Sequence, residues 1–262
     1  MGEKNIKIYD EGKEEFDLYA LRGYKVVKSN FFVQRARFNL SVKQLKIVYY
    51  IISKIKPGEE DFSYQRFNIK EFMAVCGIKD SGKNYIDVKK AIKKLADESS
   101  WVMLDDNTEV LVRWIDKAWI NKASGIIHIR LDNDLKPYLL NLGRLFTQYL
   151  LYYILPMRSQ YSIRLYELLK SYSNKRKIEF NLEELKRLLS AENYSGYKYF
   201  KRNVLEIALR EINDLTDLNI SYKTIKEGRN IVKIVFYMGI KWRLEDKIRI
   251  NHRVTEVIGP NS

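Results

Sequence analysis

One short pattern occurs twice in the sequence of 262 residues, and this repeat favours a duplicated fold. The first copy, residues 67–72, reads FNIKEF, and the second copy, residues 180–185, reads FNLEEL. In each copy an asparagine that can cap a helix follows an aromatic residue suited to a strand, and a glutamate occupies the third helical position. These two side chains can satisfy two free amides at a helix start. The pattern therefore predicts two related units in tandem.

The elements expected around the two copies follow the same order. A short helix begins after Asn68 or Asn181, and a turn containing Gly82 or Gly196 follows it. A longer amphipathic helix and a β-hairpin come next, and another helix precedes each copy. The order helix, strand, helix, turn, helix, hairpin is that of a winged helix-turn-helix. We therefore expect an α+β protein with two tandem winged-helix domains related by internal duplication.

The same features divide the chain into four segments. We expect a mobile arm over residues 1–22, a first winged-helix domain over 23–134, a second over 135–241 and a tail over 242–262. The second domain is expected to open with a helical bridge over residues 135–157. The apolar part of this bridge is too short to span a bilayer, and the polar, acidic start of the chain does not fit a signal peptide. We therefore expect a cytoplasmic protein.

Local signals place the first helix and the hairpins. Ser41 and Gln44 fit a capping box, and Pro57-Gly58 is expected to end the helix that they begin. Alternating apolar residues and turn residues predict the strands. The expected strands are 101–104, 109–120 and 126–131 in the first unit, with turns at 105–107 and 122–125, and 219–226 and 231–237 in the second, with a turn at 227–230.

The net charge indicates a polyanionic partner. The chain carries 47 basic and 33 acidic residues, a formal net charge of +14. Residues 24–135 hold 20 basic and 14 acidic side chains, and residues 136–245 hold 20 and 11, so both folded halves are basic. Nucleic acid and an anionic membrane are the candidate partners of such a chain.

The second helix of a helix-turn-helix enters the major groove of DNA. In the first unit this helix follows Gly82, and its polar side is rich in lysine. Lysine carries a point charge and suits phosphates better than base edges. The predicted DNA contacts of this helix are Lys83, Asn84, Lys90 and Lys94, opposite an apolar stripe of Tyr85, Val88, Ile92 and Leu95.

The corresponding helix of the second unit runs from Gly196 to about Leu215 and has a chemically richer outer face. Arginine can pair with guanine, asparagine with adenine, and glutamate can accept a hydrogen bond from cytosine. We therefore expect the second domain to read the DNA sequence more strictly. Its predicted contacts are Lys198, Tyr199, Arg202, Asn203, Glu206 and Arg210 on the helix, and Lys226, Arg229 and Lys233 on the hairpin.

Several longer motifs carry a resemblance to a known family. They are residues 26–30 (VVKSN), 40–46 (LSVKQLK) and 146–149 (FTQY), and the most specific is 162–169 (SIRLYELL). In these motifs the sequence resembles the iteron-binding Rep proteins, the replication initiators of theta-type plasmids. The resemblance extends over roughly residues 24–241, although the first lysine-rich helix does not match residue by residue and the segment after Trp242 matches no motif.

The resemblance implies that monomers bind direct repeats, called iterons, at a plasmid origin. It implies that the bound protein helps to melt an AT-rich stretch and recruits the host initiator and the replicative helicase. It also implies a homodimer, in equilibrium with the monomer, that represses its own gene and is held together by the first domain. The expected partners are therefore double-stranded DNA, the host replication proteins and a second copy of the chain.

Two other classes of protein remain as alternatives. One is a winged-helix transcription regulator without initiator activity. The other is an ATP-dependent enzyme, because residues 77–84 (GIKDSGKN) nearly match a phosphate-binding loop. Asn84 stands where that loop needs a hydroxyl, and residues 71–76 are expected to form a helix and not the required strand. A turn with Ser81 as helix cap is the favoured interpretation.

We expect no enzyme activity, no cofactor and no metal site. His128 and His252 are far apart in the sequence, which does not fit the paired metal ligands of a nickase, and Asp132 and Asp134 suit a helix start. The single cysteine, Cys76, is expected to be a small core residue in a reducing compartment.

Overall fold

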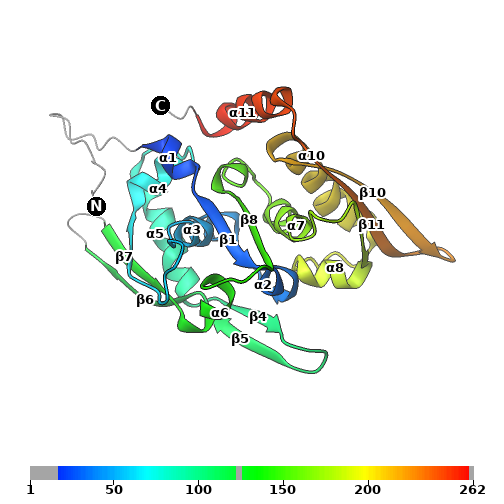
Figure 1. Cartoon of the computed structure of the whole chain (residues 1–262), viewed down its shortest axis with the longest axis horizontal. Coiled ribbons are helices and arrows are strands. Elements are labelled where there is room, and N and C mark those ends of the chain that lie inside the picture. Colours follow the sequence, from blue (N-terminus) through cyan, green and yellow to red (C-terminus); the bar gives the residue numbers. More distant parts are fainter. Residues whose placement is uncertain (1–16, 122–125, 260–262) are drawn as a thin grey trace.

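The computed structural model describes residues 17–121 and 126–259, and it contains the two winged-helix units that the repeat predicts (Figure 1). The first unit contains α2 (Asn30–Arg35), β2 (Ala36–Arg37), α3 (Val42–Ile52), β3 (Gln65–Asn68), α4 (Ile69–Val75), α5 (Gly82–Ala96), β4 (Ser99–Met103), β5 (Glu109–Arg113), β6 (Ile115–Ile120) and β7 (Ile126–Leu131). The second unit contains α7 (Gln160–Lys170), β9 (Lys177–Asn181), α8 (Leu182–Leu188), α9 (Tyr197–Phe200), the π-helical stretch η3 (Lys201–Leu205), α10 (Glu206–Leu215), β10 (Leu218–Glu227) and β11 (Asn230–Ile240).

The sheets show the duplication directly. In the first unit the antiparallel strand order is β3-β7-β6, and in the second it is β9-β11-β10, so equivalent strands occupy equivalent positions. In each unit the first of these strands leads straight into the short second helix, and the other two form the wing. The first unit differs by an added hairpin, β4 and β5, which pairs with β2. The expected α+β fold of two tandem winged helices is therefore confirmed.

The helix caps agree with the sequence in the first unit and differ in the second. The side chain of Asn68 accepts hydrogen bonds from the amides of Lys70 and Glu71, as expected. Asn181 makes no side-chain cap, so that expectation is wrong, and the first turn of α8 instead carries two glutamates that favour the positive end of the helix dipole. Ser41 forms the expected capping box, but α3 ends at Ile52, before the proline and glycine expected to end it.

The expected helical bridge over residues 135–157 is wrong. This segment contains η1 (Asn133–Leu135), the short helix α6 (Lys136–Leu139), the strand β8 (Phe146–Leu150) and the turn η2 (Leu151–Tyr153). β8 pairs antiparallel with β1 (Lys25–Ser29), and its side chains alternate between solvent and core. An alternating strand has a period of two, whereas the sequence interpretation followed the overall apolar content of the segment.

The described parts of the expected arm and of the expected tail contain helices. Residues 17–22 belong to the expected mobile arm, but Leu18–Arg22 forms the helix α1, and Arg22 is 1% exposed. Residues 244–258 of the expected tail form the helix α11 (Leu244–Ile258), which packs against α10 (Figure 1). Residues 1–16 of the arm lie outside the described residues.

Arg22 of α1 holds the ends of α4 and α11 in place. Its guanidinium donates hydrogen bonds to the carbonyl oxygens of Ala74 (3.2 Å) and Val75 (3.0 Å) at the end of α4. It also donates to the carbonyls of Ile258 (2.8 Å) and Gly259 (3.0 Å) at the end of α11. The last carbonyls of a helix lack partners within the helix and carry partial negative charge, so one buried cation holds two helix ends together.

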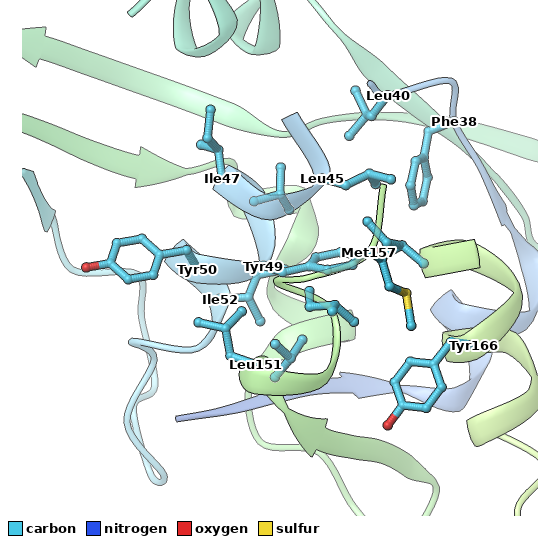
Figure 2. Packing of buried hydrophobic residues seen from close by; sticks show 14 of the residues in the cluster. Phe38, Leu40, Leu45, Ile47, Tyr49, Tyr50, Ile52, Leu151, Met157 and Tyr166 are labelled. Carbon is cyan, nitrogen blue, oxygen red and sulfur yellow. The ribbon is translucent and has the colours of Figure 1, made fainter. Parts of the chain in front are cut away.

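A continuous apolar core joins the two units. Figure 2 shows Leu45 and Tyr49 of α3 near Leu151 and Met157, which lead into α7, the first helix of the second unit. All eight residues from Ser162 to Leu169 of α7 are buried, so this helix is enclosed on every side. The relative position of the units is therefore set by packing and not by a flexible linker.

A buried charge network lies within this junction. Glu167 on α7 is 0% exposed and pairs with Lys28 of β1 and with Arg164 (2.6 Å). It also accepts hydrogen bonds from the hydroxyls of Tyr49 (3.0 Å) and Tyr149 (2.7 Å), which belong to α3 and β8. Burial alone raises the pKa of Glu167, but the charges of Lys28 and Arg164 outweigh it and lower the pKa. Burial, helped by the charge of Arg164, lowers the pKa of Lys28 to about 8, although the charge of Glu167 raises it.

We expect Glu167→Gln to lower the free energy of unfolding by about 3–5 kcal/mol, because it leaves two buried cations without a counter-charge. Lys28→Met should cost less, since Glu167 keeps Arg164 and both tyrosines. Urea denaturation followed by tryptophan fluorescence measures both variants. Glu256→Gln, in an exposed ion pair of α11, is the control. An unfolding midpoint of Glu167→Gln equal to that of the control would contradict this role.

The same network predicts how stability depends on pH. The folded pKa of Glu167 is depressed, so its contribution is fully present above the ordinary glutamate pKa of 4.5. As the pH falls below this value the unfolded chain takes up the proton first, and the contribution is lost as the pH passes through the folded pKa. The stability difference between wild type and Glu167→Gln should therefore shrink from pH 6 to pH 3. A stability difference between the two proteins that stays constant from pH 6 to pH 3 would contradict a depressed pKa of Glu167.

Candidate nucleic-acid interface

The helix α5 presents a cationic side to solvent. Its buried residues are Val88, Ile92 and Leu95, three of the four expected in the apolar stripe, and Tyr85 is partly buried. Lys83, Lys90 and Lys94 are exposed on the opposite side, as the sequence predicts, and Lys93 is exposed beside them. The amide of Asn84 donates to the hydroxyl of Ser81, which is the N-cap of the helix. Exposed lysines therefore lie on the outer face from the first turn of α5 to its last turn.

Three polar residues of α5 make local contacts, and one of them is Lys94, which forms an ion pair with Glu98 (3.8 Å). The side-chain amide of Asn84 donates a hydrogen bond to the carbonyl of Lys79 (2.8 Å). Asp87, beside the lysine stripe, forms an ion pair with Lys43 of α3 (3.9 Å). Asn84 therefore supports the turn before α5 with one of its donors, and its contact with DNA stays a prediction. The lysines carry the available charge of this helix.

The near match to a phosphate-binding loop has a structural explanation. Residues 77–84 connect α4 to α5, whereas a phosphate-binding loop follows a strand. Gly77 has a positive φ of 65°, and a Cβ atom there would lie 2.5 Å from the backbone of Ile258 on α11. Glycine is thus needed for the close approach of α11. Cys76, next to it, is buried, and burial raises the pKa of its thiol to about 12.

The recognition segment of the second unit is built from α9, η3 and α10. Phe200, Val204 and Ala208 face the core as predicted, and so does Leu205. The exposed residues include the predicted Lys198, Tyr199, Arg202, Glu206 and Arg210, together with Lys201, which the sequence interpretation missed. The π-helical stretch lies in the middle of this segment and changes which residues share a face.

Side chains on this face contact one another. The guanidinium of Arg202 lies over the ring of Tyr199 at 5.7 Å from its centre, which favours an extended position for the arginine. Lys201 and Glu206 form an ion pair of 3.5 Å. Asn203 donates one hydrogen bond to the carbonyl of Tyr199 (3.0 Å), so one of its two amide donors serves the helix itself. Arg202 is exposed on this face, and its contact with a base stays a prediction.

The second wing projects from the molecule between β10 and β11 (Figure 1). Gly228 at its tip has a φ of 59°, a conformation that glycine adopts without strain. Lys226 and Arg229 are exposed there, as predicted. Lys233 forms an ion pair with Glu179 (2.8 Å), and this hydrogen bond raises the pKa of Lys233. Its charge is therefore partly neutralised within the protein.

The first wing carries groups that the sequence interpretation missed. Its tip, residues 122–125, lies outside the described residues. On the strands, Lys117 pairs across with Arg130 and Trp119 with His128, so these four side chains share the solvent face. The two-residue alternation in β6 and β7 could have identified them. Arg130 forms a hydrogen bond with Asp116 (2.8 Å), whereas Lys117 and Trp119 are exposed.

The predicted contacts therefore form two separate sets. One set lies on α5 in the first unit, and the other lies on α9 to α10 and the second wing (Figure 1). Within residues 17–121 and 126–259 no cluster of three or more histidine, cysteine, aspartate or glutamate side chains is arranged to hold a metal ion. In the same residues, no helix combines the length and the apolar character that a bilayer crossing needs.

Comparison with known proteins identifies the family. Residues 25–170 match the family model described as "Initiator Replication protein, WH1", and residues 181–238 match "Initiator Rep protein, WH2". The first match runs past the boundary expected at residue 134 and includes β8 and α7, in keeping with the pairing of β8 with β1. The exact domain boundaries stay a prediction.

Two individual relatives add to this result. A stretch of 145 residues is 33% identical to the "PI protein" of Escherichia coli and covers 48% of this chain and 47% of that protein. The match thus spans about half the length of this curated relative. The crystal structure of the Pi initiator protein in complex with iteron DNA has a TM-score of 0.68 at 22% identity, over 84% of this chain and 98% of that chain. This likeness shows the fold, and the resemblance found in the sequence is confirmed. With both winged-helix units matched, the chain belongs to the family of initiator replication proteins.

Proposed function

We propose that this protein initiates plasmid replication by binding repeated double-stranded sites, the iterons, at the origin. The observation that carries the proposal is the presence of two recognition helices, one in each unit, whose outer faces are exposed and rich in lysine and arginine. The family membership supports it, and so does the solved relative, which is an initiator in complex with iteron DNA.

We assign different tasks to the two units. The exposed lysines of α5 suit phosphate oxygens, which fix the position of a protein on DNA without reading its sequence. Arg202 and its neighbours offer planar and acidic groups that distinguish base edges. The first unit therefore positions the protein on the duplex, and the second unit provides most of the sequence selectivity. The protein acts by assembly on plasmid DNA in the cytoplasm, and the proposal assigns it no catalytic step.

The further steps belong to the same proposal. Bound monomers help to open an AT-rich stretch and recruit the host initiator and the replicative helicase, and dimers repress the gene of the protein.

The added hairpin of the first unit supports a dimer contact there. β5 forms one edge of its sheet, and Trp101 and Leu111, directly opposite each other on β4 and β5, are both 48% exposed. An exposed strand edge with apolar side chains suits pairing with a second copy.

Two substitutions test the division of tasks. We expect Arg202→Ala to relax the preference for one or two base pairs, each worth about 1–3 kcal/mol. Lys90→Ala should weaken binding on every sequence and reduce the slope of log K against log salt by about 0.9. Titration on the specific duplex and on a random duplex, at several salt concentrations, measures both effects. Equal behaviour of the two variants on both duplexes would refute the assignment.

Selection from a random duplex library tests the function itself. We expect one enriched sequence, and we expect tandem copies of it, spaced at about 20 base pairs, in a plasmid origin. With such repeats in a supercoiled plasmid, the wild-type protein should make bases in the adjacent AT-rich stretch reactive to permanganate. Specific binding without this reactivity would instead identify a transcription regulator.

A further inference from the structure

An apolar side chain interrupts the cationic stripe of α5. Lys83, Ile86, Lys90 and Lys93 follow one another at spacings of three or four residues, so they lie on one side of the helix. The three lysines are exposed, and Ile86 is 52% exposed between them. The buried residues of α5 lie on the other side, so Ile86 does not belong to the core.

Exposure of one isoleucine would carry no inference by itself, because single apolar residues are common on protein surfaces. The position of Ile86 within a recognition helix is what matters. The N-terminal residues of such a helix contact base edges in the major groove. Ile86 is the fifth residue of α5, while Lys93 and Lys94 lie in its last turn. Ile86 therefore lies in the part of the helix that enters the groove.

The two polar residues nearest to Ile86 in the sequence are engaged in contacts within the protein. Asn84 donates to the carbonyl of Lys79, and Asp87 is paired with Lys43. The lysines on either side have long, flexible side chains that reach phosphate oxygens. A branched apolar side chain held at the surface of the helix is short, and it fits the floor of the groove between two such phosphate contacts.

We propose that Ile86 contacts the C5-methyl group of a thymine and is a specificity-determining residue of the first unit. The inference rests on the proposed binding of duplex DNA. On the major-groove edges of the four base pairs, the thymine methyl is the apolar group, and apolar side chains recognise it. The first unit then reads one base pair and does not serve as a phosphate anchor alone.

Deoxyuridine provides the test, because it lacks only this methyl group. The probe is the duplex that the wild-type protein selects from a random library, with each thymine replaced in turn by deoxyuridine. For the wild-type protein we expect one replacement to weaken binding about fourfold, the effect of one buried methyl-sized group. Ile86→Ala should bind the unmodified duplex several-fold more weakly and should bind that deoxyuridine duplex with no further loss.

Lys93→Ala is the matched control on the same face of α5. It should weaken binding equally on thymine and deoxyuridine duplexes, and its loss should depend on salt. Ile86→Val keeps a branched side chain and should keep most of the methyl effect. Because Ile86 is half exposed, none of these variants should change the melting temperature by more than a few degrees.

The outcomes separate this inference from the function on which it rests. If Ile86→Ala retains the full deoxyuridine penalty, or if the wild-type protein is insensitive at every thymine, the role of Ile86 is wrong while specific DNA binding stands. If the library yields no enriched sequence, the proposed function fails and the role of Ile86 fails with it.

Discussion

The arrangement of this protein depends on one buried carboxylate. Glu167 receives Lys28 from β1, Tyr49 from α3 and Tyr149 from β8, while its own helix, α7, leads into the strands of the second unit. A buried ionic group is costly unless every partner is in place, so the network tolerates one relative position of the two units and penalises others. Recognition helices that address one DNA molecule need such a fixed separation. The buried charges of α7 thus help to set the distance between the two recognition helices, although α7 belongs to neither of their exposed faces.

A second junction is formed by Arg22. Arg22 holds the ends of α4 and α11 together, and α11 also packs on α10, the recognition helix of the second unit. The close approach at Gly77 shows how tightly α11 lies against the first unit, since no other side chain fits there. The helices α1 and α11 therefore connect the two units at the surface, as Glu167 connects them in the interior. Disrupting either junction should weaken DNA binding, because it changes the relative orientation of the two recognition helices. The residues that contact DNA would stay the same.

The sequence predicted those parts of the fold that depend on local signals. The repeat, the cap at Asn68 and the buried side of α5 follow from spacing along a single helix. The strand β8 could not be found in this way, because its partner β1 lies more than a hundred residues earlier in the chain. The buried residues of α11 are Ile250, Val254 and Ile258, whereas its other apolar residues, Leu244, Ile248 and Val257, are exposed. The apolar content of this helix therefore does not show which side packs against a partner. At the candidate interface, the ion pair of Lys233 with Glu179 depends on a neighbour in space, which periodicity does not show. The exposed position of Ile86 does follow from its spacing on α5, but the sequence pattern alone did not single it out.

The most specific family motif lies in the interior of the protein. Residues 162–169 carry that resemblance, and all of them are buried in α7, where Arg164 and Glu167 form the junction. These residues do not reach the surface, so they cannot contact a base. The residues on the outer faces of α5 and α10 are under no such packing constraint, because their side chains point to solvent. The buried motif therefore identifies the fold, two winged helices in a fixed relative position. The DNA sequence that the protein binds depends instead on the exposed residues of α5 and α10.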